Sequence, residues 1–159
     1  MDRNELERII REKLQEIMGA EKDDTFMVEA SGRHVHLTKE HVEALFGEGY
    51  ELTPVKDLSQ PGQFAAKERV RVIGPKGEFS NVAILGPCRN FSQVELSLTD
   101  CREIGVKGVI RESGKIEGTP GILLGVGDKY VHLDKGVIVA KRHIHMTRED
   151  AERFSVKDG

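Results

Sequence analysis

The sequence predicts a mainly β fold, a small β-barrel capped by short helices. Two observations predict this class. Many short segments alternate between apolar and polar residues and are separated by turns with glycine and proline, as in small barrels. A few other segments begin at a capping residue and carry apolar residues at helical spacing. A chain of 159 residues is long enough for one such domain, or for two small ones.

Composition and charge restrict the function classes. Hydrophobic residues make up 38% of the chain and charged residues 32%, which is typical of a soluble globular protein. The net charge of −3 and the absence of tryptophan argue against a nucleic-acid partner. No apolar run is as long as a membrane span, and two cysteines are too few for a disulfide framework. These features predict a cytoplasmic protein with reduced thiols and no membrane or nucleic-acid partner.

The first segment, residues 1–19, is predicted to be an amphipathic helix. Its apolar residues fall on one stripe, namely Leu6, Ile9, Ile10, Leu14, Ile17 and Met18. Residues 20–32 follow as a polar linker and then a strand. The helix could pack on the domain as its first element, or it could be a docking peptide for a groove on a partner.

One segment occurs twice. Residues 33–40 have the sequence RHVHLTKE, and residues 142–149 repeat it as RHIHMTRE. Residues i and i+2 of a strand point to the same face, about 6.6–7 Å apart, so the two histidines of each copy could converge on one ion. The pairs are His34 with His36, and His143 with His145.

The residues around each histidine pair predict a strand followed by a helix. Val35 and Ile144 lie between the histidines and would point the other way, into a core. Thr38 and Thr147 are good N-cap residues, and charged residues follow both.

The remaining elements follow in order. Residues 47–67 are predicted to be an irregular insert. Further strands are predicted at 69–72, 82–85, 93–99, 109–110, 122–124, 130–133 and 137–145. The first two form a hairpin, and residues 154–159 would be a strand entering a turn. The apolar residues expected to fill the barrel are Val70, Val72, Ile84, Val94, Leu96, Leu98, Leu123 and Val139.

Glu95 is the strongest candidate to share a site with the histidines, because it lies on the polar face of its predicted strand. Two histidines and a carboxylate with one position open form a catalytic-zinc arrangement.

Arg89, in the loop before the predicted strand of Glu95, would by itself be solvated. Cys88 could be a nucleophile or a zinc ligand, but a packed thiol is the simpler interpretation. No Ser-His or Cys-His pair is evident, and the single histidines His41 and His132 are predicted to be structural.

Several motifs, in the same order, resemble the PduL-type phosphate acyltransferases, the phosphate propanoyltransferases of bacterial microcompartments. They are GRHVHL at 32–37, LSQPGQFAA at 58–66, GPCR at 86–89, SQVE at 92–95, GTPGI at 118–122 and AKRHIHM at 140–146. The resemblance covers nearly the whole chain from residue 26 onward, so it is far more specific than a single H-x-H motif.

The resemblance implies transfer of a short acyl group, such as propanoyl or acetyl, between coenzyme A and inorganic phosphate. It also implies two zinc ions. The ligands to the first would be His34, His36 and Glu95, and those to the second would include His143 and His145. Arg89 would be the catalytic phosphate-binding residue, and Ser31 and Lys56 would contact coenzyme A. Without an evident nucleophile, we expect direct attack by phosphate and no acyl-enzyme.

The resemblance further implies a two-barrel architecture. Residues 33–140 would form the middle barrel, while residues 20–32 and 141–159 would belong to a second barrel that is truncated here. The strand at 26–32 would then pair with residues 154–159, be disordered, or add to a neighbouring molecule. Residues 1–19 resemble an encapsulation peptide, which favours docking to shell or core proteins inside a microcompartment. A homo-oligomer is also possible.

Two other interpretations remain open. His34, His36 and Glu40 resemble part of a cupin motif, which would bind iron or manganese in a small barrel. Thr38 argues against this, because a helix starting there takes Glu40 off the strand. The non-enzymatic alternative is a zinc-stabilised binding module that attaches to a scaffold through the N-terminal helix.

Overall fold

The computed structural model describes Glu5, Ile9 and residues 31–157. The chain divides into two units, of which one comprises residues 31–146 and the other residues 1–30 with 147–159. The predicted helix at 1–19, apart from Glu5 and Ile9, and the predicted strand at 26–30 lie outside the described residues. Within the described part of the chain, no helix is both long and apolar enough to cross a membrane.

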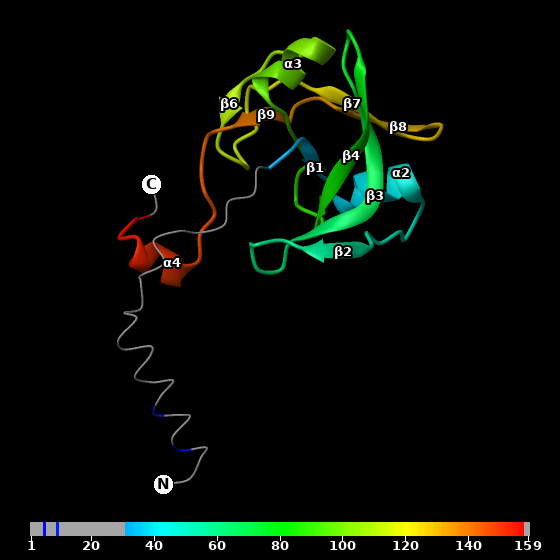
Figure 1. The fold of residues 1–159 in the computed structure, drawn as a ribbon. Helices are drawn as coiled ribbons and strands as arrows, with labels where there is room; N and C mark the ends of the chain where they lie inside the picture. Colours follow the sequence, from blue (N-terminus) through cyan, green and yellow to red (C-terminus); the bar gives the residue numbers. More distant parts are fainter. Residues whose placement is uncertain (1–4, 6–8, 10–30, 158–159) are drawn as a thin grey trace. The chain divides into compact units, whose positions relative to one another are not determined.

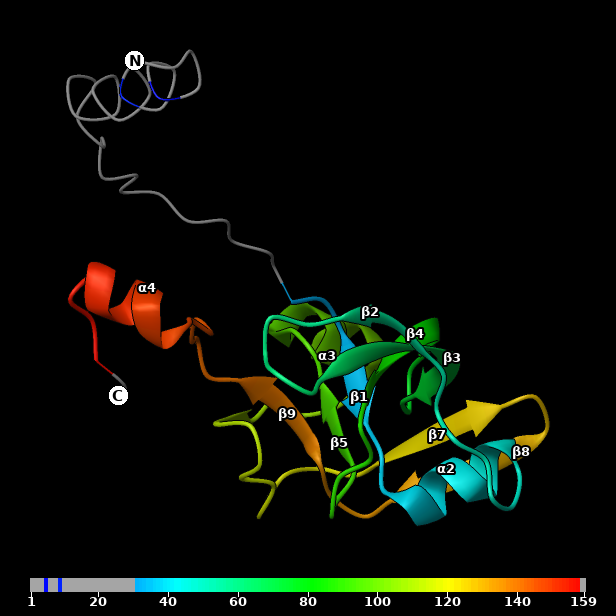
Figure 2. The same ribbon diagram turned by 90° about the horizontal axis from the view of Figure 1, so that it is seen from below.

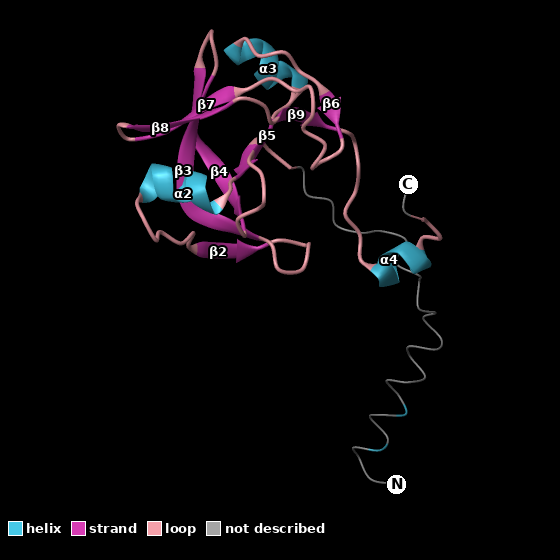
Figure 3. Ribbon diagram, turned by 180° about the vertical axis from the view of Figure 1, so that it is seen from behind, coloured by secondary structure: helices cyan, strands magenta, loops and turns pink. Residues whose placement is uncertain are grey.

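The unit of residues 31–146 is built on one mixed β-sheet (Figure 1). In the described residues, the strand order is β6-β9-β5-β1-β4-β3-β7-β8, and β2 pairs with β3. The strands are β1 (His34–His36), β2 (Pro54–Asp57), β3 (Phe64–Ile73), β4 (Glu78–Gly86), β5 (Gln93–Glu95), β6 (Ile110–Arg111), β7 (Ile122–Val126), β8 (Lys129–Leu133) and β9 (Val137–Ala140). The mainly β class is therefore confirmed. The sheet curls into an open half-barrel, and strands dominate the unit in Figure 3.

Strand β1 occupies the middle of this sheet. It pairs in parallel with β4 and antiparallel with β5, and β5 pairs in parallel with β9. Figure 2 shows β1, β5 and β9 side by side. The predicted hairpin is β3 with β4, although β3 begins at Phe64, five residues before the predicted start.

The core lies against the apolar face of the central strands. Val35 of β1 is opposite Ile84 of β4 and Val94 of β5, and all three are fully buried. The predicted core residues that are buried are Val70, Val72, Ile84, Val94 and Leu96. Val139 is half-buried against this core. Leu123 is only half-buried because β7 has the opposite alternation and buries Ile122 and Leu124 instead.

Two helices begin at the predicted threonines. Helix α2 (Lys39–Phe46) begins after Thr38, whose hydroxyl accepts from the His41 amide at 3.2 Å. Helix α4 (Arg148–Arg153) begins after Thr147, whose hydroxyl accepts from the Asp150 amide at 3.1 Å. In both cases the side chain satisfies a backbone N–H that has no partner inside the helix.

The predicted strand at 93–99 is wrong beyond Glu95. Ser97 begins helix α3 (Leu98–Ile104) through a capping box. The Ser97 hydroxyl accepts from the Asp100 amide and the Asp100 carboxylate accepts from the Ser97 amide, both at 3.0 Å. This reciprocal pair satisfies two helix N–H groups and outweighs the alternation of the sequence. Leu98, predicted to be in the core, is consequently 44% exposed.

Three further predictions are corrected. The insert at 47–67 contains β2, whose Pro54 is tolerated because it is the first residue of the strand. The strand predicted at 137–145 ends at Ala140, and residues 141–147 are irregular. Residues 154–155 form a turn rather than a strand, with φ of 54° at Ser155.

Candidate metal centre

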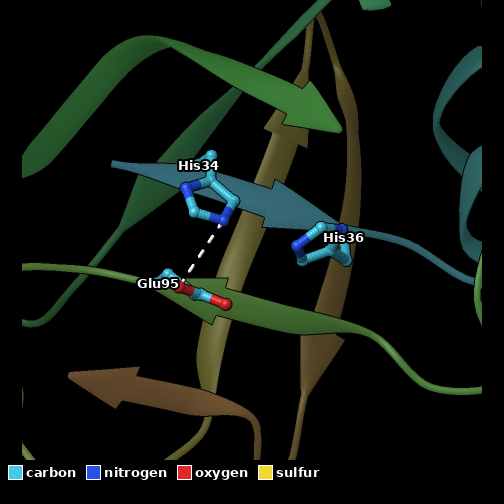
Figure 4. Close-up of side chains that lie close together, drawn as sticks. All are labelled: His34, His36 and Glu95. Carbon is cyan, nitrogen blue, oxygen red and sulfur yellow. Dashed lines mark ion pairs between the residues drawn. The ribbon is translucent and has the colours of Figure 1, made fainter. Parts of the chain in front are cut away.

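Strands β1 and β5 place four polar side chains on one face of the sheet. His34 lies opposite Glu95, and His36 lies opposite Gln93. Directly opposite residues of an antiparallel pair point to the same face, with Cβ atoms about 4.5–5.5 Å apart. Figure 4 shows both imidazole rings on β1 and the Glu95 carboxylate reaching toward His34 from β5. The alternation that buries Val35 is therefore what gathers these groups.

His34, His36 and Glu95 form the one group in the described part of the chain that could hold a metal ion through three His, Cys, Asp or Glu ligands. Their ligand atoms all lie within 4.8 Å of one another. His34 Nε2 is 3.6 Å from Glu95 Oε2. Tetrahedral zinc with bonds of about 2.0–2.1 Å separates neighbouring ligand atoms by roughly 3.3–3.4 Å, so the pair of His34 and Glu95 is already close to that spacing. Both histidines are buried, with 7% and 3% exposure.

Backbone carbonyls fix the orientation of both rings. His34 Nδ1 lies 2.9 Å from the Gly32 oxygen, and His36 Nδ1 lies 3.2 Å from the Leu85 oxygen. A carbonyl oxygen only accepts, so each Nδ1 carries the hydrogen and donates. In each ring, Nε2 is therefore the nitrogen that is left to bind a metal ion. A metal-ligating histidine is commonly held in this way, with the other ring nitrogen donating to a carbonyl.

The Glu95 carboxylate is held on one side only. Its Oε1 accepts from Gln93 Nε2 at 2.7 Å and from the Ser113 hydroxyl at 3.1 Å. The fully buried Gln93 side chain is itself fixed, because its oxygen accepts from the Gly114 amide at 2.8 Å. Oε2 is thereby left facing His34. Sequence reasoning missed the part played by Ser113, which reaches the site from a loop 18 residues after Glu95.

The protonation states suit metal binding. Burial raises the pKa of Glu95, but the hydrogen bond and charge of His34, with help from Ser113, outweigh it and hold that pKa at about 2. Burial lowers the pKa of His36 to about 4, and the charges of Arg89 and His34 act in the same direction. At neutral pH Glu95 is therefore a carboxylate and His36 is neutral, the forms that a metal ion requires.

Arg89 supplies a positive charge next to these ligands. Its side chain is half-buried, and Nη1 lies 3.4 Å from the Ser113 hydroxyl that also bonds Glu95. Burial lowers the pKa of Arg89 and the Glu95 carboxylate opposes this. A guanidinium stays charged at neutral pH, so the site combines a carboxylate-imidazole cluster with a fixed cation that can bind an anion.

The second histidine pair converges without a strand. His143 and His145 are exposed, yet their Nε2 atoms lie 3.0 Å apart. His143 Nδ1 donates to the Lys141 oxygen at 2.6 Å, repeating the bond from His34 to the carbonyl two residues earlier. Burial and the charge of His143 lower the pKa of His145, while the charge of Glu95 opposes them.

The remaining candidates lie as follows. Ser31 Oγ is 3.4 Å from His34 Nδ1, whereas Lys56 is exposed on β2. Cys88 is exposed next to Arg89, and burial of part of its side chain raises the pKa of the thiol. His41, predicted to be structural, lies 2.7 Å from the Ser92 hydroxyl through Nδ1, a Ser-His contact that was not evident from the sequence. Glu40 is exposed on α2, away from the β1 face that a cupin site would use.

Comparison with known proteins gives one consistent result. A family model described as phosphate propanoyltransferase matches residues 27–159. A phosphate propanoyltransferase of Leptotrichia buccalis is 93% identical over 159 residues, covering 100% of this chain and 75% of the relative. That of Sebaldella termitidis is 74% identical with the same coverage. That of Clostridioides difficile is 56% identical over 154 residues, which is 96% of this chain and 74% of the relative.

Proposed function

The chain belongs to the phosphate propanoyltransferase family, and from this premise we propose that it transfers a short acyl group between coenzyme A and inorganic phosphate at a zinc site. That it is a transferase, a phosphate acyltransferase, follows from the family. The observation that supports the finer proposal is the cluster of His34, His36 and Glu95, with Arg89 linked to Glu95 through the Ser113 hydroxyl.

The donor set fits zinc. Two imidazoles present Nε2, and one carboxylate presents Oε2 while its other oxygen is bonded elsewhere. We assign His34, His36 and Glu95 to one zinc ion, and His143 and His145 as part of the ligand set of a second. When bound, zinc supplies a Lewis acid that polarises a carbonyl oxygen and stabilises a leaving thiolate.

Arg89 binds and orients phosphate in this proposal. Phosphate is a weak and well-hydrated nucleophile, so holding it in line with the thioester carbon is a large part of the catalysis. A guanidinium fork matches two phosphate oxygens, and the long 3.4 Å contact with Ser113 leaves most of its donors available. The attacking oxygen forms the new C–O bond, the C–S bond breaks, and coenzyme A leaves as a thiolate.

The attack is direct, without an acyl-enzyme. The raised pKa of Cys88 keeps it a thiol at neutral pH, which makes it a poor nucleophile. The Ser92 hydroxyl does face a histidine, but it is buried and already accepts from the Thr38 amide. Recovery of a covalent acyl adduct on Cys88 after incubation with acyl-coenzyme A would overturn this part of the proposal.

Other parts of the proposal concern coenzyme A and location. We assign Ser31 and Lys56 to contacts with coenzyme A, and Ser31 lies next to His34.

We also propose that residues 1–19 dock the enzyme onto microcompartment proteins, and that residues 33–140 form one barrel of a two-barrel architecture. Fusing residues 1–19 to a fluorescent protein tests the docking proposal, which fails if the fusion does not enter microcompartments.

A thiol-release assay tests the function. With propanoyl- or acetyl-coenzyme A, free thiol should appear only when phosphate is added, and acyl phosphate should form in equal amount. Release without phosphate would indicate a hydrolase, and no release would favour a zinc-stabilised module. A cupin-type enzyme would instead carry iron or manganese, and metal analysis of the same sample distinguishes it.

A further inference from the structure

The loop between β4 and β5 carries Arg89 and is held to the end of the histidine strand at two points. The Arg89 amide donates to the Leu37 oxygen at 2.8 Å, and the Thr38 amide donates to the Ser92 hydroxyl at 2.9 Å. Leu37 and Thr38 directly follow β1. The position of Arg89 is therefore set relative to His34 and His36 through the backbone of residues 37–38.

The Ser92 hydroxyl is the centre of this attachment. It is 6% exposed, and besides accepting from Thr38 it lies 2.7 Å from His41 Nδ1 on the first turn of α2. A hydroxyl has one hydrogen and two lone pairs, so it can serve both partners at once. Removing either side chain leaves a polar group in this buried place with one partner fewer.

The loop is closely packed at both ends. At its start, a side chain on Gly86 would meet the Phe64 ring at 2.3 Å, and at its end the backbone oxygen of Ser92 lies so near Gly136 that a side chain there would meet it at 2.7 Å. Among the described residues, the one side-chain hydrogen bond of Arg89 is the long contact with Ser113. The place of its guanidinium therefore depends mainly on where the backbone is held.

We propose that Ser92 and His41 form a positioning pair that sets the place of Arg89 for phosphate. This inference rests on the proposed function, because it takes Arg89 as the phosphate-binding residue. Ser92 and His41 do not contact the reacting atoms. They act through the 87–92 loop, and their loss should weaken use of phosphate more than use of acyl-coenzyme A.

The test compares His41→Ala, His41→Asn and Ser92→Ala in the whole chain. The Asn amide has an atom at the position of Nδ1 and should restore the contact. Losing one hydrogen bond of this kind predicts a KM for phosphate about three- to ten-fold higher in the two Ala variants. The KM for acyl-coenzyme A and the metal content should stay unchanged, and His41→Asn should behave like the parent.

Hydrogen exchange at the Arg89 amide gives a second readout, independent of activity. The Ala variants should exchange this amide faster, whereas His132→Ala, which removes an exposed histidine on β8, should not. Because His41 is only half-buried, its variants keep the test informative even if Ser92→Ala fails to fold. Unchanged exchange of the Arg89 amide in the Ala variants overturns the positioning role alone. An unchanged KM for phosphate in these variants, in an assay where Arg89→Ala raises that KM, overturns it as well. No phosphate-dependent transfer in the parent overturns the proposed function and this inference together.

Discussion

The two copies of the histidine motif have nearly the same sequence and different structures. His34 and His36 lie on a strand between β4 and β5 and are buried, whereas His143 and His145 lie in an irregular segment and are exposed. The residue between them is fully buried in the first copy and 64% exposed in the second. A strand needs partners on its flanks, so the local pattern alone does not determine the structure.

What the two copies share is equally informative. In each, the first histidine donates from Nδ1 to the carbonyl two residues earlier, and a threonine four residues after it caps a helix. These features are local, so they survive without the sheet. The comparison indicates that the first pair is preformed, because the sheet holds it in place. The second pair is dependent, because its position is held by fewer contacts.

Replacing the two pairs should give the largest difference. His34→Ala with His36→Ala should remove the tightly bound zinc and all transferase activity, because two of three ligands are lost. His143→Ala with His145→Ala should lower activity but keep that zinc. Metal analysis and the thiol-release assay measure both effects. Equal zinc loss in the two double variants would contradict the division into a preformed and a dependent pair.

Arg89→Ala should have the next largest effect. Loss of one charged group that stabilises the transition state predicts a rate about 10²–10³-fold lower, by analogy with removal of one oxyanion donor. Zinc content should be unchanged, since Arg89 is not a ligand. Loss of zinc in this variant would make Arg89 a structural residue, and a parent-like rate would remove it from the mechanism.

The buried first pair should also make the metal-free protein acid-sensitive. The pKa of His36 falls from 6.5 in the unfolded chain to about 4 in the folded protein. Between these values the unfolded chain binds more protons, so stability is lost as pH falls from 6.5 towards 4. At about 1.4 kcal/mol per unit, the loss is on the order of 3 kcal/mol.

Denaturant titration of the metal-free protein at several pH values measures this loss. His36→Gln should remove most of it. His145→Gln should remove less, because His145 is exposed, although its pKa is also lowered. Glu95 adds to the loss only below about pH 4.5, where the unfolded chain takes up a proton that the folded protein, with its Glu95 pKa of about 2, does not. A stability that rises on acidification would contradict the protonation states assigned here.

The residues between the histidines should give the smallest effects. Val35→Ala removes two buried methyl groups and should cost about 2–3 kcal/mol of unfolding free energy. Ile144→Ala should change it by less than about 0.5 kcal/mol, because the side chain is exposed. Equal costs would mean that Ile144 is buried in solution and that the two copies are alike.

Local signals made much of the fold predictable. The helix starts at Thr38 and Thr147 and the β3–β4 hairpin depend on capping and alternation, which the sequence displays directly. Helix α3 was missed because Leu96 and Leu98 continue an alternating pattern, although Ser97 and Asp100 carry a capping-box signal. Closure of the sheet depends on pairings between distant strands, and no local pattern specifies them.

The candidate site was predictable to the same extent. His34, His36 and Glu95 could be named because each lies on the polar face of a predicted strand, and the register then brings them together. Ser113 and the contact between Ser92 and His41 could not, because they come from loops brought close only by the tertiary fold.

Zinc content tests the central claim most directly. The purified chain should hold about one tightly bound zinc ion, because one cluster is preformed. Glu95→Ala should lose it, while Glu40→Ala, which removes an exposed carboxylate on α2 from the same stretch of sequence as the histidines, should keep it. A zinc-free parent protein, or a Glu95→Ala variant with undiminished zinc, would contradict the assignment of His34, His36 and Glu95 as the metal ligands.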